Sequence, residues 1–356
     1  MIIMKAEATE QQIADVVREI QRFGLRADVS HGEFRTVIGL IGDERRIPFD
    51  HFAILPGVKE VLKVETPYKL ISREYIKVSQ GLTNYTQTIK VGKVKIGGDE
   101  PVFIAGPCAV ESREQVFRIA QEVKKAGAHI LRGGVFKPRS SVHSFQGLGA
   151  GGRDEAEVAL EWLSGAGREF DLPIVTEIRG EAHADLIAEY ADILQIGARN
   201  MYDQDLLTKV AKMKKPVLFK RHFGASIEEF LSFAEYIAAE SNKNIILCER
   251  GIVPIGKGRE YTRYTLDLAA VPAIQKETFL PIIVDPSHAT GRRDLIFSMS
   301  CAAIAAGANG LMIEVHYNPA EALVDGRQAI TPDELRNTIK ACREINELVV
   351  SKASTY

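Results

Sequence analysis

The sequence predicts an α/β fold in which a small N-terminal ferredoxin-like α+β domain precedes a (β/α)8 TIM barrel. Two observations lead to this prediction. Residues 1–72 show the element order β-α-β-β-α-β, which is typical of ferredoxin-like domains. Across residues 101–356, short apolar segments alternate with helical segments, and about eight such units are the pattern of a (β/α)8 barrel.

The small domain can be read one element at a time. Apolar residues at helical spacing between Ile13 and Ile20 precede Gly24, and they indicate a helix that ends there. The pair His31-Gly32 between two apolar segments indicates a hairpin. The pattern leaves two roles open, a contribution to stability and a regulatory module. The expected elements are residues 2–6, 9–23, 28–30, 35–41, 48–55 and 58–64.

Residues 73–100 are expected to form a linker between the two domains. Within it, residues 88–91 and 94–96 flank Gly92-Lys93 and indicate a small hairpin.

Eight apolar strand candidates follow, and helical segments come after nearly all of them. An open, doubly wound sheet is the structural alternative. No G-x-G-x-x-G motif follows the first strand, which argues against that alternative. The strand candidates are residues 102–106, 129–132, 173–177, 192–196, 216–220, 244–248, 281–285 and 310–314.

Composition is ordinary for a globular protein and excludes several functional classes. The chain has 356 residues, of which 46% are hydrophobic and 26% charged. The net charge of −2 provides no basic field, so we expect neither nucleic acid nor a membrane as a partner. Four cysteines without a recognisable secretion signal favour a cytoplasmic protein over a disulfide scaffold.

Polar or charged side chains stand at the end of every predicted barrel strand. In a (β/α)8 barrel these ends converge on the active-site face. Cations that converged there without partners would repel one another, so the pattern predicts anionic ligands such as phosphates and a carboxylate. The residues are Cys108, Arg132 with Lys137 and Arg139, Glu177, Arg199, Lys220, Arg250, His288, and Glu314 with Asp325.

Four of these residues form a candidate metal site. Taken singly, Cys108 reads as a buried, inert residue and His288 as a structural histidine. Glu314 ends an apolar strand, where a carboxylate needs a partner. A divalent cation bound by these three residues and Asp325 satisfies all of them, and this donor set suits Mn, Fe, Co or Zn better than Mg.

Several motifs around these strand ends together resemble one enzyme family. They are Ala105-Gly106-Pro107-Cys108 with Glu111-Ser112, Arg132-Gly133-Gly134, Lys137-Pro138-Arg139-Ser140-Ser141, Phe145-Gln146-Gly147-Leu148-Gly149, Gln195-Ile196-Gly197-Ala198-Arg199-Asn200, Cys248-Glu249-Arg250-Gly251 and Asp285-Pro286-Ser287-His288. This set resembles the 3-deoxy-D-arabino-heptulosonate 7-phosphate (DAHP) synthases, the entry enzymes of the shikimate pathway. The resemblance runs over nearly the whole chain and is to the single-barrel subtype with an N-terminal ferredoxin-like regulatory domain.

The resemblance implies a transferase that forms a carbon–carbon bond. Its substrates would be phosphoenolpyruvate and erythrose 4-phosphate, and its products DAHP and phosphate. In the implied mechanism, a divalent metal ion polarises the aldehyde, the enol carbon attacks it, water adds at C2 and phosphate leaves by C–O cleavage. The resemblance also implies a homo-oligomer, a tetramer, and feedback by an aromatic amino acid, Tyr or Phe.

The resemblance assigns roles to individual residues. The metal would be held by Cys108, His288, Glu314 and Asp325. Phosphoenolpyruvate would be bound by Arg132, Lys137, Arg199, Lys220 and Arg250, and erythrose 4-phosphate by Pro138, Arg139, Ser140 and Ser141. We count Lys137, Cys108 and His288 as the catalytic residues, and we assign Glu177 to the substrate site from its place at a strand end.

Four departures from the family pattern lie near the barrel mouth and bear on the aldehyde substrate. His222 stands where the family usually has Gly, and Tyr264 stands where it usually has Asn. Tyr202-Asp203-Gln204 replaces Gln-Asn-Phe, and Val142-His143 replaces Pro-Tyr.

Two other functions compete with this interpretation. A related phosphoenolpyruvate–aldose condensing enzyme, such as a 3-deoxy-D-manno-octulosonate 8-phosphate synthase, shares the barrel and the Gly-Pro-Cys start. Its loop after the second strand resembles Lys-Ala-Asn-Arg-Ser, so the loop at residues 137–141 favours the four-carbon aldose. A non-catalytic barrel that senses an amino acid through residues 1–72 is the other candidate, and the complete metal set argues against it.

Overall fold

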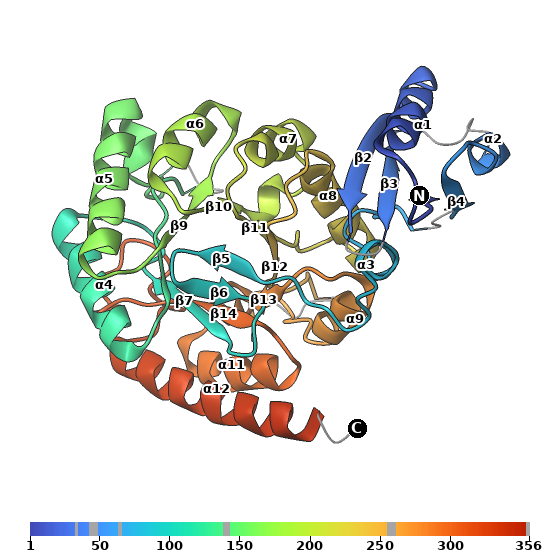
Figure 1. The fold of residues 1–356 in the computed structure, drawn as a ribbon. Helices are drawn as coiled ribbons and strands as arrows, with labels where there is room; N and C mark the ends of the chain where they lie inside the picture. The colour runs from blue at the N-terminus through green and yellow to red at the C-terminus, as the bar shows by residue number, and fades with distance from the viewer. Residues whose placement is uncertain (33–34, 43–48, 63–65, 138–142, 255–260, 354–356) are drawn as a thin grey trace.

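The computed structural model describes residues 1–356 except 33–34, 43–48, 63–65, 138–142, 255–260 and 354–356. It consists of a small α+β domain beside a larger barrel (Figure 1). Both parts of the predicted fold are confirmed. None of the helices in the described part of the chain combines the length and the apolar character that crossing a membrane requires.

The small domain is a four-stranded antiparallel sheet with the strand order β2-β3-β1-β4. The hairpin expected around His31-Gly32 is present, because Arg26 to His31 pair with Thr36 to Ile41. The elements are β1 (Ile2–Met4), α1 (Glu10–Arg22), β2 (Arg26–His31), β3 (Thr36–Ile41), α2 (Phe49–Ala53) and β4 (Val58–Val61).

Helix α1 shows why these residues form the predicted elements. Thr9 caps its N-terminus through a capping box with Gln12, which satisfies two backbone N–H groups that lack helical partners. Ile13, Val16 and Ile20 are buried on one face of the helix, as their spacing predicts.

The segment between the domains is more structured than the expected linker. Helix α3 (Arg73–Gln80) was not predicted, although Ser72 caps it and Gly81 ends it in the left-handed conformation. The predicted hairpin is present as β5 (Ile89–Val91) and β6 (Val94–Ile96). Ile89, Val91 and Ile96 pack with residues of the barrel interior, so the hairpin closes the N-terminal end of the barrel.

The barrel is a closed ring of eight parallel strands, and every strand overlaps its predicted position. The strands are β7 (Val102–Gly106), β8 (Ile130–Arg132), β9 (Ile174–Ile178), β10 (Ile193–Ile196), β11 (Val217–Lys220), β12 (Ile245–Glu249), β13 (Ile282–Val284) and β14 (Gly310–Glu314). The helices are α4 (Arg113–Ala126), α5 (Arg153–Glu169), α6 (Glu181–Tyr190), α7 (Gln204–Lys212), α8 (Ile227–Ala239), α9 (Ala270–Glu277), α10 (Pro286–Thr290), α11 (Ile296–Ala305) and α12 (Pro332–Ala353).

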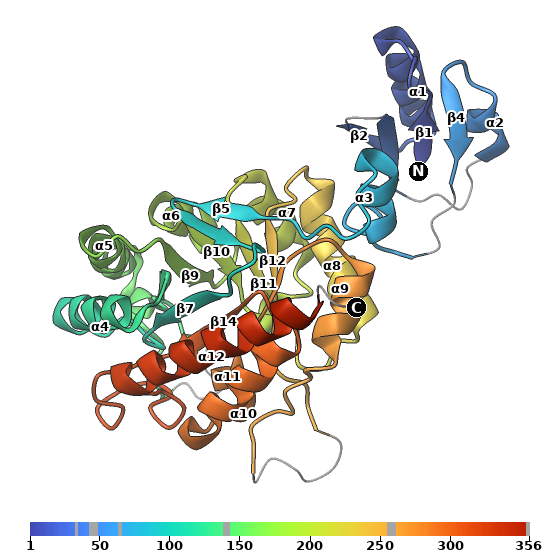
Figure 2. The ribbon, with the colours of Figure 1, turned by 60° about the horizontal axis from the view of Figure 1, so that its bottom comes forward.

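The small domain lies beside α8 and α9, with α3 between it and the barrel in both views (Figure 1; Figure 2). A polar cluster joins the two parts. Lys243 Nζ lies 3.2 Å from Asp28 Oδ2 and 2.9 Å from the Tyr75 hydroxyl, which donates to the same carboxylate at 3.1 Å. Arg26 Nη1 pairs with Glu240 Oε1 at 3.0 Å.

Candidate active site

The four predicted metal ligands converge at the C-terminal ends of the barrel strands. Cys108 follows β7, His288 lies in α10 after β13, Glu314 ends β14, and Asp325 lies in the loop that follows. One donor atom of each residue lies within 4.8 Å of the donor atoms of the other three. Residues separated by more than 200 positions in the chain therefore form one cluster, as the sequence predicts.

Two short contacts define the cluster. Cys108 Sγ lies 3.3 Å from Asp325 Oδ2, and His288 Nε2 lies 3.1 Å from Glu314 Oε1. Burial and the Glu314 charge raise the pKa of the Cys108 thiol. A thiolate and two carboxylates this close repel one another unless a cation lies among them. The mixed donor set therefore fits a divalent metal ion.

The orientation of His288 is fixed by Asp285, a residue to which the sequence reasoning gave no role. Asp285 Oδ2 lies 2.7 Å from His288 Nδ1, and Asp285 Oδ1 accepts the His288 backbone N–H at 2.9 Å. A carboxylate at Nδ1 leaves Nε2 available as a ligand, and such partners commonly orient metal-binding histidines. Burial alone would raise the pKa of Asp285, but the His288 and Lys220 charges hold it well below its usual range.

Glu314 is fixed in the same way by two neighbours. Arg132 Nη1 lies 2.8 Å from Glu314 Oε1, and Gln328 Nε2 donates to Oε2 at 2.6 Å. Burial alone would raise the pKa of Glu314, but the charges of His288 and Arg132 hold it well below its usual range. Gln328 was also missed, because an uncharged loop residue gives no signal in the sequence.

A cavity of about 340 Å³ opens beside this cluster, and its walls are rich in cations. Lys220 Nζ is buried and pairs with Asp285 Oδ2 at 2.5 Å. Arg250 is also buried, and its Nη1 finds no hydrogen-bond partner among the residues that the structure describes. The predicted residues that line the cavity are Lys137, Glu177, Arg199, Lys220, Arg250, His288 and Asp325.

Two of these wall residues differ in environment. Arg199 lies in an exposed turn at Ala198–Asn200. Glu177 accepts a hydrogen bond from Gln195 Nε2 at 2.9 Å. A Cβ atom at Gly197 would lie 2.0 Å from Glu177 Oε1, so a larger residue at position 197 would displace the Glu177 carboxylate from its present place.

Part of the predicted aldose site cannot be placed. Pro138, Arg139, Ser140 and Ser141 lie outside the described residues, as does Val142. His143 is exposed in a turn, and Asp203 caps α7 by accepting the Leu206 backbone N–H at 3.0 Å.

Comparison with known proteins identifies the family of this chain. Residues 75–351 match the DAHP synthetase I family, and residues 1–66 match the DAHP synthase ferredoxin-like domain. A phospho-2-dehydro-3-deoxyheptonate aldolase from Thermotoga maritima is 44% identical over 354 residues, which cover 99% of this chain and 100% of that protein.

A crystal structure of the aldolase (DAHP synthase) from Thermotoga maritima aligns with a TM-score of 0.75 at 44% identity, covering 98% of this chain and 97% of that one. A 2-dehydro-3-deoxyphosphooctonate aldolase from Syntrophotalea carbinolica is 30% identical over 280 residues, or 74% of this chain and 97% of that protein. The family match spans both domains and the complete strand-end cluster, and the chain belongs to the DAHP synthetase I family.

Proposed function

We propose that the barrel mouth condenses phosphoenolpyruvate with erythrose 4-phosphate to give DAHP and phosphate, the first step of the shikimate pathway. The observation that carries this proposal is the convergence of four donor atoms within 4.8 Å beside a cavity lined by buried cations. Family membership supports the same reaction.

Cys108, His288, Glu314 and Asp325 would hold the metal ion. When bound, a divalent cation supplies Lewis-acid polarisation of the aldehyde carbonyl. The residues around it account for the rest of the site. Asp285 orients His288, while Arg132 and Gln328 hold the two oxygens of Glu314.

The cations of the cavity bind and orient phosphoenolpyruvate. A guanidinium such as that of Arg250 matches phosphate and carboxylate oxygens with two parallel hydrogen bonds, whereas Lys220 supplies a point charge. Holding both anionic groups aligns the enol carbon with the aldehyde, which gives orientation and electrostatic stabilisation without covalent participation of the protein. Water then adds at C2 of the former enol, and phosphate leaves by cleavage of the C–O bond.

Lys137 is proposed as the proton donor to the aldehyde oxygen. Burial alone would lower the pKa of its ammonium group, but the electrostatic influence of the neighbouring Cys108 and Glu177 side chains raises it above the usual value. The buried Nζ therefore keeps its proton at neutral pH, beside the thiol of the metal cluster.

The aldose substrate is what distinguishes the two candidate reactions, because both use phosphoenolpyruvate. The chain is also similar to a phosphooctonate aldolase, so a five-carbon aldose phosphate is the second candidate. Supplying phosphoenolpyruvate with a panel of four- and five-carbon sugar phosphates separates the two, with the product identified by NMR. DAHP formed from erythrose 4-phosphate is the expected product. A product formed only from a five-carbon aldose would overturn the assignment.

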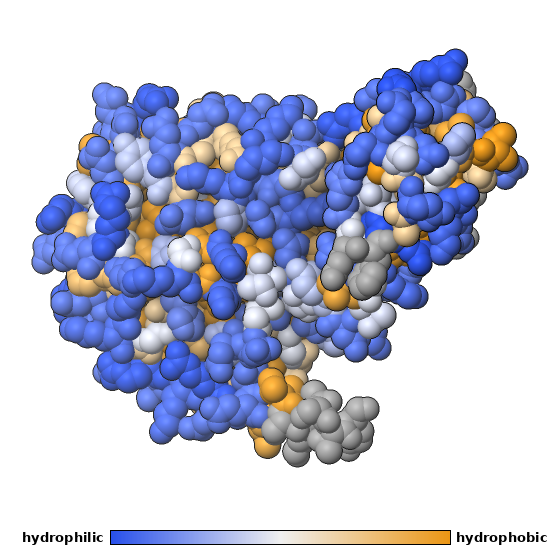
Figure 3. Space-filling model, in the orientation of Figure 1, coloured by the Kyte–Doolittle hydropathy of each residue, from blue (hydrophilic) through white to orange (hydrophobic). Residues whose placement is uncertain are grey.

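We also propose that residues 1–72 form a regulatory domain and that the active protein is a homo-oligomer, a tetramer. An aromatic amino acid, Tyr or Phe, would bind between small domains of neighbouring subunits and block the barrel mouth. The small domain carries an apolar cluster at its outer end, near α2 (Figure 3), where Ile54 is 81% exposed. Such a patch suits contact with a second copy.

A chain that begins at Tyr75 tests this regulation. It should keep its activity, because every metal and cation residue of the site lies beyond residue 100, and it should lose inhibition by the amino acid. Inhibition is read from initial rates with Tyr, Phe, Trp, chorismate and prephenate. If the full chain ignores all five compounds, the regulatory proposal fails.

A further inference from the structure

Four aromatic rings form a continuous chain of ring contacts at the barrel mouth, which we call the stack, although only its last pair is stacked face to face. The ring centroids of Tyr202 and His222 lie 5.1 Å apart, those of His222 and Phe223 lie 4.1 Å apart, and those of Phe223 and Tyr264 lie 5.3 Å apart. The last pair is stacked at an interplanar angle of 24°. Three loops that are distant in the sequence supply these rings.

The stack coincides with the departures from the family pattern. His222 stands where Gly is usual, Tyr264 where Asn is usual, and Tyr202 where Gln is usual. In the sequence they look like separate substitutions. In the structure each ring contacts the next, so they behave as one structural unit.

The backbone around Tyr264 holds its ring in a fixed place. The Tyr264 N–H donates to Ala289 O at 2.7 Å, and Thr265 exchanges backbone hydrogen bonds with Ile252. Gly251 has a φ of +92°, and a Cβ atom there would lie 2.8 Å from the Tyr264 Cβ. The loop therefore fits only against glycine at this position.

Arg250 lies against this ring. Its guanidinium carbon lies 4.2 Å from the centroid of Tyr264, which is a cation–π contact. Its Nη2 donates to His288 O at 3.2 Å, and its Nη1 has no partner among the described residues. The Tyr264 side chain, through its ring and its hydroxyl, and the His288 carbonyl thus hold the guanidinium. The buried Nη1 remains for a ligand in the cavity that Arg250 lines.

The His222 ring adds no charge to the cations that line the cavity. Burial and the Arg250 charge lower the pKa of His222, so the imidazole is neutral at pH 7. Its Nδ1 accepts the Gly224 N–H at 3.1 Å, which fixes the ring plane.

We infer that Tyr264 is a positioning residue for Arg250, and that Phe223, His222 and Tyr202 hold its ring in place. The stack orients the guanidinium toward the phosphate or carboxylate of phosphoenolpyruvate. This inference rests on the proposed function, since it takes Arg250 as a phosphoenolpyruvate ligand. It assigns the aromatic departures to the phosphoenolpyruvate side of the reaction.

The test separates the ring from the hydroxyl and from the aldose. Tyr264→Phe keeps the ring and removes only the hydroxyl, which also interacts with Arg250, so it should raise the KM for phosphoenolpyruvate less than loss of the ring does. Tyr264→Leu removes the ring and should raise that KM by about tenfold, with the KM for erythrose 4-phosphate within about twofold. Tyr261→Leu is the matched control, because Tyr261 is 73% exposed three residues away. Tyr264→Met, which fills a similar volume without a ring, replaces the Leu variant if that variant does not fold.

A second pair of variants tests the stack as a unit. His222→Gly alone should raise the KM for phosphoenolpyruvate. Added to Tyr264→Leu, it should change that KM by less than about twofold, because His222 acts through the Tyr264 ring. Fully additive effects would show that His222 does not act through Tyr264 and would overturn that part of the inference.

Arg250→Ala separates the proposed role of Arg250 in binding phosphoenolpyruvate from the positioning role inferred for Tyr264. If it leaves the KM for phosphoenolpyruvate unchanged, the proposed role of Arg250 fails and the inference fails with it. If Arg250→Ala raises that KM strongly while Tyr264→Leu does not, Arg250 keeps its role and the positioning inference alone is wrong. An equal rise of both KM values in Tyr264→Leu would also contradict the inference.

Discussion

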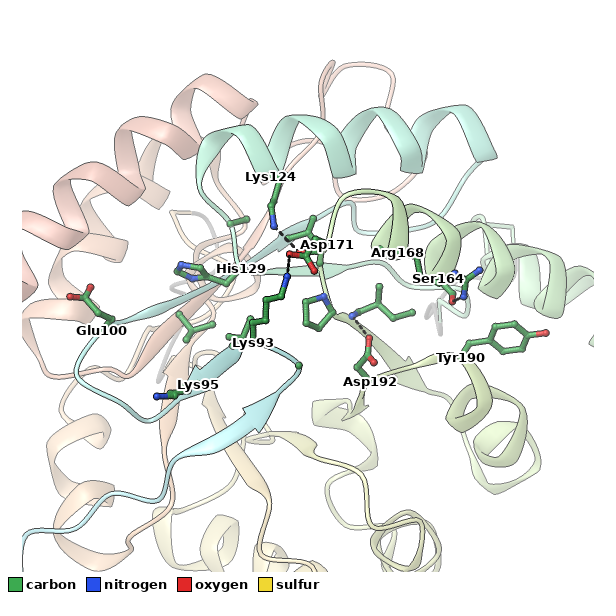
Figure 4. A pocket seen from close by; sticks show the side chains of 18 of the residues that line it. Lys93, Lys95, Glu100, Lys124, His129, Ser164, Arg168, Asp171, Tyr190 and Asp192 are labelled. Atoms are coloured by element: carbon green, nitrogen blue, oxygen red, sulfur yellow. Dashed lines mark hydrogen bonds and ion pairs between the residues drawn. The ribbon is translucent and has the colours of Figure 1, made fainter.

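The two ends of the barrel both carry cavities lined by charged residues, and they differ in how those charges are held. Of two such cavities, the one at the N-terminal end is the larger, about 880 Å³ against about 340 Å³ beside the candidate metal ligands. It lies beside the hairpin β5–β6, and Lys93, Lys124 and His129 are among its lining residues (Figure 4). A third cavity of about 1170 Å³, lined by Arg199, Tyr264 and Asp325 among others, also opens on the side of the mouth.

The charges of the cavity at the N-terminal end are solvated. Lys93 pairs with Asp171 at 2.9 Å, but their side chains are 85% and 68% exposed. At the mouth, Arg132 with Glu314 and Lys220 with Asp285 are buried. Burying such pairs costs desolvation free energy that a folded protein tolerates only when hydrogen bonds or a ligand offset it. Charge burial therefore distinguishes the cavity beside the candidate metal ligands from the cavity at the N-terminal end.

The largest effect on activity is expected at the four candidate metal ligands. Cys108→Ser should lower kcat by more than about 100-fold with little change in fold, because serine is a poor substitute for a thiolate ligand. EDTA should inactivate the wild type, and added divalent metal should restore it. Initial rates, metal content and circular dichroism check this, with Cys301→Ser on α11 as the control. A Cys108→Ser protein that keeps its metal and near-normal turnover would show that Cys108 is not a ligand.

A second large effect is expected at Arg250. Arg250→Ala should raise the KM for phosphoenolpyruvate by about 10- to 100-fold, because a buried, charge-assisted contact has no replacement in alanine. The KM for erythrose 4-phosphate should change far less. Steady-state kinetics with each substrate varied in turn measure the two constants. Equal changes in both would count against the division of the mouth into two substrate sites.

Glu235 is a buried carboxylate that lies away from both ends of the barrel and, among the residues that the structure describes, has no cation paired with it in an ion pair. Glu235 Oε1 accepts the backbone N–H groups of Lys69 and Leu70 at 2.8 and 2.7 Å, where the C-terminal end of residues 1–72 meets α8. Its Oε2 has no hydrogen-bond partner in the described part of the chain. Burial raises the pKa of Glu235 to about 7, from an ordinary value of 4.5.

This pKa predicts a pH-dependent stability. The folded state binds the Glu235 proton more tightly than the unfolded state, so the contribution to stability is complete below about pH 4.5 and is lost as the pH rises through 7. Glu235→Gln should match the wild type within about 1 kcal/mol at pH 5 and exceed its free energy of unfolding by at most about 3 kcal/mol at pH 8. Urea unfolding at both pH values measures this, with exposed Glu228→Gln as the control. A difference that does not vary with pH would contradict the assigned pKa.

The smallest effect is expected at the cavity at the N-terminal end of the barrel. Lys93→Ala removes an exposed ion pair, which contributes about 0–1 kcal/mol, so stability should barely change. The value of kcat/KM for both substrates should stay within about twofold of the wild type, because this cavity lies at the opposite end from the metal cluster. A loss of activity comparable with that of Arg250→Ala would show that the N-terminal end of the barrel also takes part in function.

Both parts of the fold and the convergence of the four candidate ligands can be predicted from the sequence, because their signals are local and repeated. Each barrel strand is an apolar segment that the sequence shows directly. Because active-site residues lie at the C-terminal ends of barrel strands, Cys108 after β7 and Glu314 at the end of β14 are expected to lie close together. Helix α3 was not predicted, because its eight residues fall in a segment interpreted as a linker, although Ser72 and Gly81 mark its ends.

The parts of the site that the sequence did not predict depend on contacts between side chains in the loops. The Asp285 carboxylate touches His288 and Lys220, and no periodicity encodes that pairing. The aromatic stack is the clearer case, because Tyr264 reads as a lone substitution until the fold places Phe223 beside it. The contacts of Asp285 with Lys220 and of Phe223 with Tyr264 require the three-dimensional arrangement, since in each pair the partners come from different strand ends.

Anomalous diffraction from crystals soaked in Mn²⁺ and phosphoenolpyruvate would locate both the metal ion and the substrate. We expect one manganese peak bounded by Cys108, His288, Glu314 and Asp325, with the phosphate of phosphoenolpyruvate in the cavity beside Arg250. We expect no phosphate in the cavity at the N-terminal end. Manganese held elsewhere, or phosphoenolpyruvate seated beside Lys93 and Lys124, would contradict the proposed site.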